Sequence, residues 1–141
     1  MAGTKKKRIL LICLVCDPDE SMESRVGWNR TLQAAQYLDT TVICKFAPSV
    51  LRMAGELAAL PSSRRPTIYV LPFTKLMQWI WKIPGMWSIA YWLWQRQAFK
   101  LAQQLHNQDP FHVAHQVDLA TYREPGFLWR MKVPFVCCRF Q

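Results

Sequence analysis

Four residues of this sequence are suited to contact a polar or anionic ligand: Gly27, His115, Arg123 and Glu124. Gly27 stands in SRVGWN, just before a helical pattern. A glycine there lets a ligand approach the backbone, and a helix N-terminus favours an anion. A glycine that only makes a turn explains the same residue equally well. The sequence has no G-x-G-x-x-G and no G-x-x-x-x-G-K-[ST], so neither a dinucleotide site nor a P-loop is predicted.

His115 is the histidine best placed for a ligand, because it lies where a predicted strand gives way to its loop. His112 precedes it by three residues, so strand alternation sends the two side chains to opposite faces and no shared metal is predicted. Arg123 and Glu124 follow in the loop, where they form a solvated pair, cap a first helical turn or contact hydroxyl groups. No Ser/His/Asp order or other nucleophile is recognisable, so we assign no catalytic residue, metal or cofactor.

Cys13 and Cys16 have the C-x-x-C spacing of a redox motif or a zinc knuckle. They lie in the apolar run ILLICLVC, however, where a strand would alternate its side chains between faces. No second pair follows at zinc-site spacing. An odd total of five cysteines, mostly in apolar runs, is typical of reduced thiols in a cytosolic protein. We therefore predict buried structural cysteines.

Apolar runs of strand length alternate with helical stripes along the chain. The predicted strands are 8–16, 41–46, 67–71, 111–115 and the run VPFVCC at 133–138, and the predicted helices are 28–38, 51–60 and a short one opened by Glu124 and Pro125. No hairpin dipeptide such as Asn-Gly occurs. This alternation predicts a Rossmann-like, three-layer α/β/α fold with a mainly parallel sheet, formed by residues 1–141 as a single domain.

The segment 73–94 holds five of the seven tryptophans. Residues 76–94 carry one charge, Lys82, and approach the length of a membrane span, but Pro84 and Gly85 break the run in its middle. Beyond the break, one apolar stripe follows helical spacing: Tyr91, Trp94, Ala98, Leu101 and Leu105. We therefore predict an amphipathic helix of a globular fold, with tryptophans beside lysines that suit a membrane surface better than a full span.

The composition limits the class of partner. A length of 141 residues with 51% hydrophobic and 19% charged residues supports one folded domain and makes disorder improbable. Eighteen basic against nine acidic residues give a formal charge of +9, which favours phosphorylated ligands or anionic lipid. No basic stripe with interleaved aromatic residues is present, so nucleic acid is not a predicted partner. The N-terminal KKKR and the apolar run after it lack a signal-peptide cleavage site, which favours a cytoplasmic location.

Three segments resemble the N-terminal domain of bacterial glycosyltransferases of family 4, which have the two-domain GT-B fold. They are RVGWNRTLQAAQYLDTTVIC at 25–44, YWLWQRQAFKLAQQLH at 91–106 and FHVAHQVDLATYREPGFLWRMKVPFV at 111–136. The similarity runs from about Arg8 to Val136 and is weak between Phe46 and Trp87. The part HQVDLATYREPGFLWRMKVPFV is the most specific.

The resemblance implies transfer of a sugar from a nucleotide-sugar donor to a sugar or lipid-linked acceptor, with this domain on the acceptor side of the cleft. It implies that Gly27 faces donor phosphate and acceptor, that His115 is the cleft histidine, and that Arg123 and Glu124 line the acceptor side. The family continues after the last strand into G-P-x-G-G and a donor-binding domain, whereas this chain ends in CCRFQ. We therefore expect half an enzyme, inactive alone, working in the cytoplasm and at the inner face of the membrane.

Two other functions fit the same residues. One is a non-enzymatic α/β module that binds a ligand or a partner, although no clear flavin loop follows the first strand. The other is a membrane-surface interaction protein built on residues 75–94. Binding to acidic and neutral liposomes separates these two.

Overall fold

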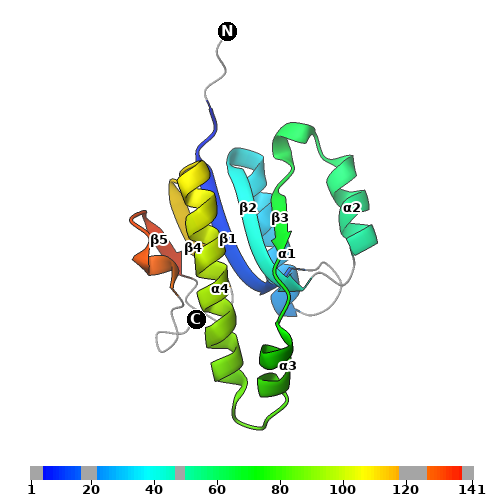
Figure 1. The fold of residues 1–141 in the computed structure, drawn as a ribbon. Coiled ribbons are helices and arrows are strands. Elements are labelled where there is room, and N and C mark those ends of the chain that lie inside the picture. Colours follow the sequence, from blue (N-terminus) through cyan, green and yellow to red (C-terminus); the bar gives the residue numbers. More distant parts are fainter. Residues whose placement is uncertain (1–4, 17–21, 47–49, 118–126, 138–141) are drawn as a thin grey trace.

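The strand β1, Arg8–Val15, is the centre of a five-stranded sheet with the order β3-β2-β1-β4-β5 (Figure 1). The computed structural model describes residues 5–16, 22–46, 50–117 and 127–137. The remaining strands are β2 Asp39–Phe46, β3 Thr67–Val70, β4 Val113–Gln116 and β5 Phe135–Cys137. Every pairing among these strands is parallel, which confirms the predicted α/β fold with a parallel sheet.

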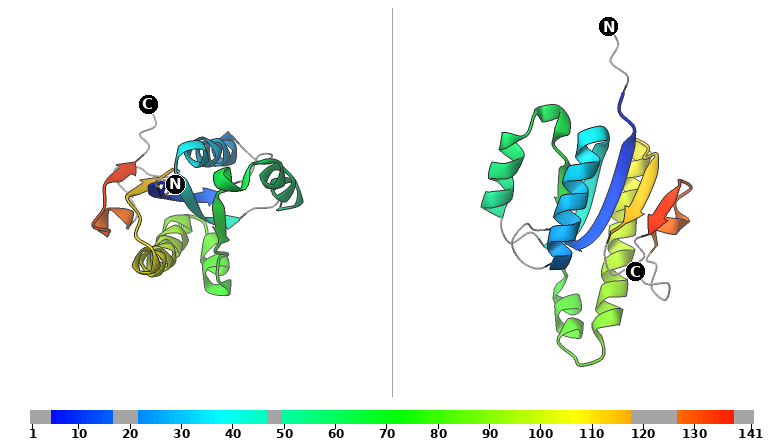
Figure 2. Two further views of the ribbon diagram at one scale, coloured as in Figure 1. Left: turned by 90° about the horizontal axis from the view of Figure 1, so that it is seen from above. Right: turned by 180° about the vertical axis from the view of Figure 1, so that it is seen from behind.

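Helices cover both faces of the sheet, so the fold has three layers. Figure 2 shows α1 and α2 on one face and α3 and α4 on the other. The α-helices are α1 Met22–Tyr37, α2 Val50–Ala59, α3 Lys75–Trp81 and α4 Trp87–Gln108, and two 3₁₀ turns are η1 Ser62–Arg64 and η2 Leu128–Arg130. The predicted helix at Glu124 and Pro125 lies outside the described residues.

The unbroken apolar sequence of β1 follows from burial on both sides. Leu10 and Ile12 pack toward α3 and α4, whereas Ile9 and Leu11 pack toward α1 and α2. All four side chains are buried. A strand with only one buried face would alternate apolar and polar residues, so the apolar composition of β1 indicated its central place in the sheet.

The helix α1 begins six residues earlier than predicted, at Met22 in place of Trp28. The prediction followed the apolar stripe, and the buried residues Trp28 and Ala35 do mark its inward face. The first turns, however, consist largely of polar or exposed residues, so no apolar periodicity announced them. An apolar stripe identifies the part of a helix that packs against the core, but it does not show where the solvent-exposed start of the helix lies.

The tryptophan-rich segment forms two helices because the chain turns at Pro84 and Gly85. Gly85 has a φ of 78°, a left-handed conformation that favours glycine. The predicted stripe on α4 is confirmed: Tyr91, Trp94 and Ala98 are buried, and Leu101 and Leu105 are partly buried against the same core. Within the described ranges, no helix combines the length and the apolar character needed to cross a bilayer.

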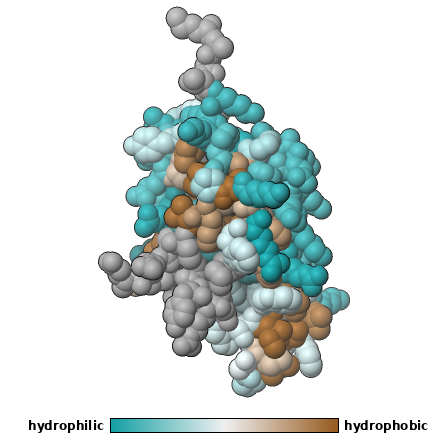
Figure 3. All heavy atoms as spheres, turned by 90° about the vertical axis from the view of Figure 1, so that its left-hand side faces the viewer, coloured by the Kyte–Doolittle hydropathy of each residue, from teal (hydrophilic) through white to brown (hydrophobic). Residues whose placement is uncertain are grey.

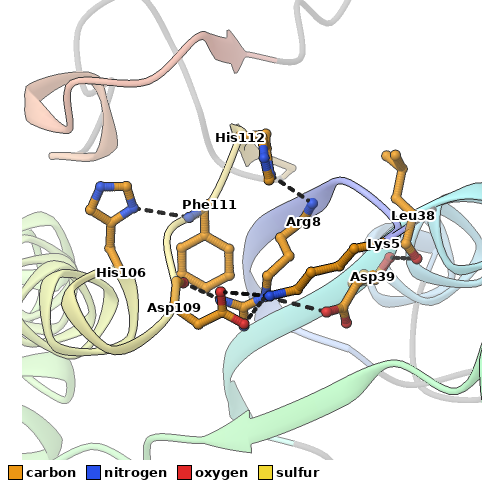
Figure 4. A network of polar contacts seen from close by, with 9 residues as sticks. Lys5, Arg8, Leu38, Asp39, His106, Asp109, Phe111 and His112 are labelled. Carbon is orange, nitrogen blue, oxygen red and sulfur yellow. Dashed lines mark hydrogen bonds and ion pairs between the residues drawn. The ribbon is translucent and has the colours of Figure 1, made fainter. Parts of the chain in front are cut away.

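A polar network joins the amino ends of the strands to the end of α4 (Figure 4). The Arg8 guanidinium forms ion pairs with the carboxylates of Asp39 at 3.3 Å and Asp109 at 3.5 Å, and it also donates to the Asp109 carbonyl. The Arg8 amide donates to Nδ1 of His112 at 3.0 Å, and the guanidinium lies 4.4 Å from the centre of the Phe111 ring. Arg8 therefore holds together the starts of β1 and β2, the end of α4 and the segment before β4.

Candidate functional site

The sheet has a topological switch point between β1 and β4, where a doubly wound fold places its ligand. The strands run side by side, with Leu11 opposite His115 and Ile12 opposite Gln116. Val117 follows β4, and its amide donates to the Ile12 carbonyl at 3.0 Å. Residues 17–21 and 118–126, which follow these two strands in the sequence, lie outside the described ranges. Arg123 and Glu124 are among them, so their predicted contacts stay predictions.

Gly27 does not precede the helix, as predicted, but lies inside α1. It is buried, and its carbonyl accepts a hydrogen bond at 2.8 Å from the hydroxyl of Thr31, one turn further along. Because α1 starts at Met22, the amides of its first turn belong to residues before Gly27. The expectation that Gly27 opens the helix is therefore wrong, for the same reason that the helix start was misplaced, and its contact with a ligand stays a prediction.

His115 is the third residue of β4, and its side chain lies on the sheet face that carries α1. It lines a pocket of about 450 Å3 whose other walls come from β1 and α1: Leu11, Arg30, Gln33, Ala34, Gln36 and Tyr37. Its register partner Leu11 lies four residues before the end of β1, so His115 stands back from the carboxyl edge of that central strand. The structure thus brings His115 to α1 residues that the sequence had not grouped with it.

Two effects lower the pKa of His115 below its ordinary value of 6.5: burial first, and then the positive charge of Arg30. The imidazole is therefore held neutral beside a permanent cation. Arg30 and the amides of Gln33 and Gln36 provide hydrogen-bond donors, and a neutral imidazole offers one donor and one acceptor. Such a pocket suits a polyhydroxyl or anionic group, and its residues are equipped to bind such a ligand.

This arrangement predicts how stability depends on pH. A histidine with a depressed folded-state pKa contributes stability above its unfolded pKa of 6.5, and that contribution is lost as the pH falls through 6.5 toward the folded value. We expect His115→Gln to make the free energy of unfolding less dependent on pH below about 6.5. Urea unfolding followed by circular dichroism across this range measures the slope.

Arg30→Gln serves as the companion variant. It removes the charge that disfavours the imidazolium, so it should weaken the same pH dependence in part while His115 stays in place. An unchanged slope in His115→Gln would assign the pH dependence to other groups.

A second pocket, of about 420 Å3, lies beside the carboxyl ends of β2 and β3. Its walls come from β2, the residues after β3, α3 and the residue after it: Lys45, Pro72, Phe73, Gln78, Trp81 and Lys82. The ammonium of Lys45 lies 4.0 Å from the centre of the Phe73 ring and 5.3 Å from that of Trp81. The two rings meet edge to face at 5.3 Å. An aromatic wall with two ammonium groups suits a ligand that combines an anion with an apolar part.

Sequence reasoning missed this second pocket. The one available signal was the alternation in TTVICKF, which puts Lys45 on the same face as Ile43, the face that α3 and α4 cover. A lysine on a covered face needs an interaction partner for its ammonium group. No sequence pattern predicted that the rings of Phe73 and Trp81 would be that partner.

A buried polar cluster joins α4 to β4. The Gln95 amide donates to the Tyr91 hydroxyl at 2.5 Å, and the Gln116 amide lies 3.4 Å from the same oxygen. Gln95 and Gln116 are almost fully buried. Gln116 is the last residue of β4, so the cluster fixes α4 against the strand that ends at the switch point. The sequence signal was a tyrosine and a glutamine four residues apart on one face of a helix.

Cys13, Cys16 and Cys44 are buried, as predicted. The expected alternation of Cys13 and Cys16 is wrong, because both pack in the core on the α1 side. Strand β1 ends at Val15, so Cys16 no longer follows the strand period. The Sγ of Cys16 lies 3.9 Å from the Thr31 hydroxyl. Among the residues that the structure covers, no group of three or more His, Cys, Asp or Glu is arranged to hold a metal ion.

Comparison of the chain with protein-family models, with curated proteins and with solved structures found no match.

Proposed function

We propose that this chain is the acceptor-side domain of a GT-B glycosyltransferase, which moves a sugar from a nucleotide-sugar donor to a sugar or lipid-linked acceptor. One observation carries the proposal. Of the segments on which the family resemblance depends, 25–44 contains most of α1, the helix that follows β1, and 111–136 contains β4; β1 and β4 are neighbours across the switch point. A parallel sheet of this order binds its ligand at that position.

In this proposal, the residues after β1 and β4 contact the acceptor. Arg123 and Glu124 offer the donors and acceptors that recognise sugar hydroxyls, and both follow β4 in the chain. The His115 pocket lies on the α1 side of the sheet, and the Tyr91 cluster holds β4 from the opposite face. Gly27 lies inside α1 and has no assigned role in this scheme.

The proposal includes a location. A lipid-linked acceptor is presented at a membrane, and the +9 charge of the chain favours an anionic surface. We place the protein in the cytoplasm, at the inner face of the membrane, as a peripheral protein.

A second function is supported by the Lys45 pocket. It lies away from the β1–β4 switch point, in the region 46–87 where the family resemblance is weak. A non-enzymatic α/β module that binds an amphiphilic anion there would need neither a donor nor an acceptor sugar.

The test uses the purified 141-residue chain. We expect no release of nucleoside diphosphate from any nucleotide-sugar donor, because the described residues form one sheet. Preorganised charges around the leaving phosphate, which dominate such barriers, have to come from a second domain. In the same samples, a short-chain polyprenyl-diphosphate sugar should shift the NMR amide signals of Cys16 and Val117, at the ends of β1 and β4.

Arg123→Ala should weaken that response, whereas Arg130→Ala, a matched arginine in η2, should leave it unchanged. Acceptor-dependent release of nucleoside diphosphate by this chain alone would contradict the division of roles. The binding module would be favoured by two results together: the acceptor sugar shifts no NMR amide signal near the ends of β1 and β4, and an amphiphilic anion shifts the amide signals of Lys45 and Phe73.

A further inference from the structure

The turn between α3 and α4 is the far end of the molecule. The tip, defined here as residues 75–92, comprises α3, the turn and the first turns of α4. It extends beyond the sheet at the end toward which the strands run (Figures 1 and 2). Whatever the tip touches therefore lies opposite the carboxyl edge of the sheet, where the ligand site is expected.

Large apolar side chains of the tip face outward. Those with exposed surfaces are Leu76, Trp79, Trp81, Trp87, Ile89 and Trp92. Trp79 is 64% exposed and Trp87 47%, so neither ring is part of the core. Figure 3 shows apolar residues gathered at this lower end of the molecule. Exposed apolar surface of this density marks a contact site in folded proteins.

The inner side of the tip is anchored, so the exposed face has a defined shape. Met77 and Ile80 of α3 and Ala90 of α4 are buried in the core. The Thr74 hydroxyl caps α3 by accepting from the Met77 amide at 3.3 Å. Gly85 makes the turn in a left-handed conformation. The tryptophans thus project from a packed pair of helices.

Charge selects the partner. Between Glu56 and Asp109 the chain has no acidic residue, whereas it has several basic ones: Arg64, Arg65, Lys75, Lys82, Arg96 and Lys100. Lys75 and Lys82 are exposed and belong to the tip itself. Tryptophan beside lysine on a surface without carboxylates is the chemistry of the interface of an anionic bilayer.

We propose that the tip docks on the anionic surface of a lipid bilayer, with Trp79 and Trp87 at the headgroup level and Lys75 and Lys82 against the phosphates. In this orientation the carboxyl edge of the sheet faces the bilayer. The inference deepens the location given in the proposed function, and lipid binding tests it without any sugar transfer. If the tip does not bind lipid, the proposed role in sugar transfer is still judged by its own experiment, and the reverse also holds.

The experiment is flotation of the purified chain with vesicles. We expect binding to phosphatidylcholine vesicles that contain about a third phosphatidylglycerol, and weak binding to phosphatidylcholine alone. Raising the salt from about 0.1 M to about 1 M should reduce binding to the anionic vesicles. The double variant Trp79→Ala, Trp87→Ala should lower the partition coefficient by at least about tenfold, because both rings leave the apolar interface. Lys75→Glu, Lys82→Glu should lower it by more than about tenfold, since each basic residue near the surface contributes roughly fivefold.

Matched controls separate the tip from net charge and from tryptophan content. Arg64→Glu, Lys100→Glu makes the same change in charge away from the tip, and Trp129→Ala removes an equally exposed ring from η2. Both should bind much like the parent chain. Equal binding by the Trp79 and Trp87 double variant, or loss of binding in both control variants, would overturn the proposal. So would a chain that ignores vesicles and instead dimerises through Trp79 and Trp87, as seen by size-exclusion chromatography.

Discussion

Trp94→Ala is expected to lower the free energy of unfolding by about 4 kcal/mol, the largest loss from any single substitution considered for this chain. The indole is fully buried in the core between the sheet and α4. Its Nε1 donates to the Leu71 carbonyl at 2.7 Å, and its ring stacks on Tyr91 with centres 6.3 Å apart. Alanine leaves a cavity and a carbonyl without its donor, and both terms destabilise.

The measurement is urea unfolding followed by circular dichroism. Trp87→Ala is the matched control, since it removes the same side chain from the same helix at a site that is 47% exposed. It should cost less than about 1 kcal/mol. Equal losses in the two variants would mean that the core does not close around Trp94 as described. The control also tests whether the chain stays folded without the Trp87 ring, and the double variants used for vesicle binding are measured in the same way.

Arg8→Met is expected to cost about 2 to 3 kcal/mol, because at the amino end of the sheet it leaves Asp39 without its cation and Asp109 with only the exposed Lys5. The Arg8 side chain is only 13% exposed, whereas Asp39 and Asp109 are about half exposed, and their partial hydration keeps the loss below that of a fully buried pair. Methionine keeps an unbranched side chain of similar length but removes the guanidinium, so the loss includes the contact of that group with the Phe111 ring.

Lys5→Met provides the comparison. Lys5 pairs with Asp109 at 3.4 Å, but its side chain is 78% exposed, and its removal should cost less than about 0.5 kcal/mol. A loss in Arg8→Met no larger than this would show that the network contributes little. The same unfolding experiment measures both variants, ideally at low and high salt.

The architecture was predictable because its main helices and strands produce recognisable patterns of apolar residues in the sequence. The unbroken apolar run of β1 indicates a strand buried on both faces, and the break at Pro84 and Gly85 divides one hydrophobic stretch into two helices. Where no apolar contact is made, the pattern fails. The solvated start of α1 carried no stripe, and so Gly27 was misplaced.

The pockets were less predictable because they depend on the order of strands in space. His115 meets Arg30 only because β4 lies beside β1, and Lys45 meets Phe73 and Trp81 only because the chain turns into α3 directly after β3. The type and spacing of residues indicate what kind of partner a side chain needs, but not which residue supplies it. That depends on which strands pair across long distances in the sequence, and a local pattern does not contain this information.

The pairing of β1 with β4 has a consequence during synthesis. Ile9 pairs with Val113, so the most apolar strand is made first and one of its two edges waits for residues made about a hundred positions later. At the usual rate of ribosomal elongation this wait lasts roughly 5 to 20 seconds. In that time β2 can join one side of β1, while the other side presents unpaired backbone N–H and C=O groups between apolar side chains to any similar strand nearby. Nascent chains of this protein should therefore depend on chaperones until β4 emerges, and a ribosome that pauses between residues 46 and 113 should increase aggregation.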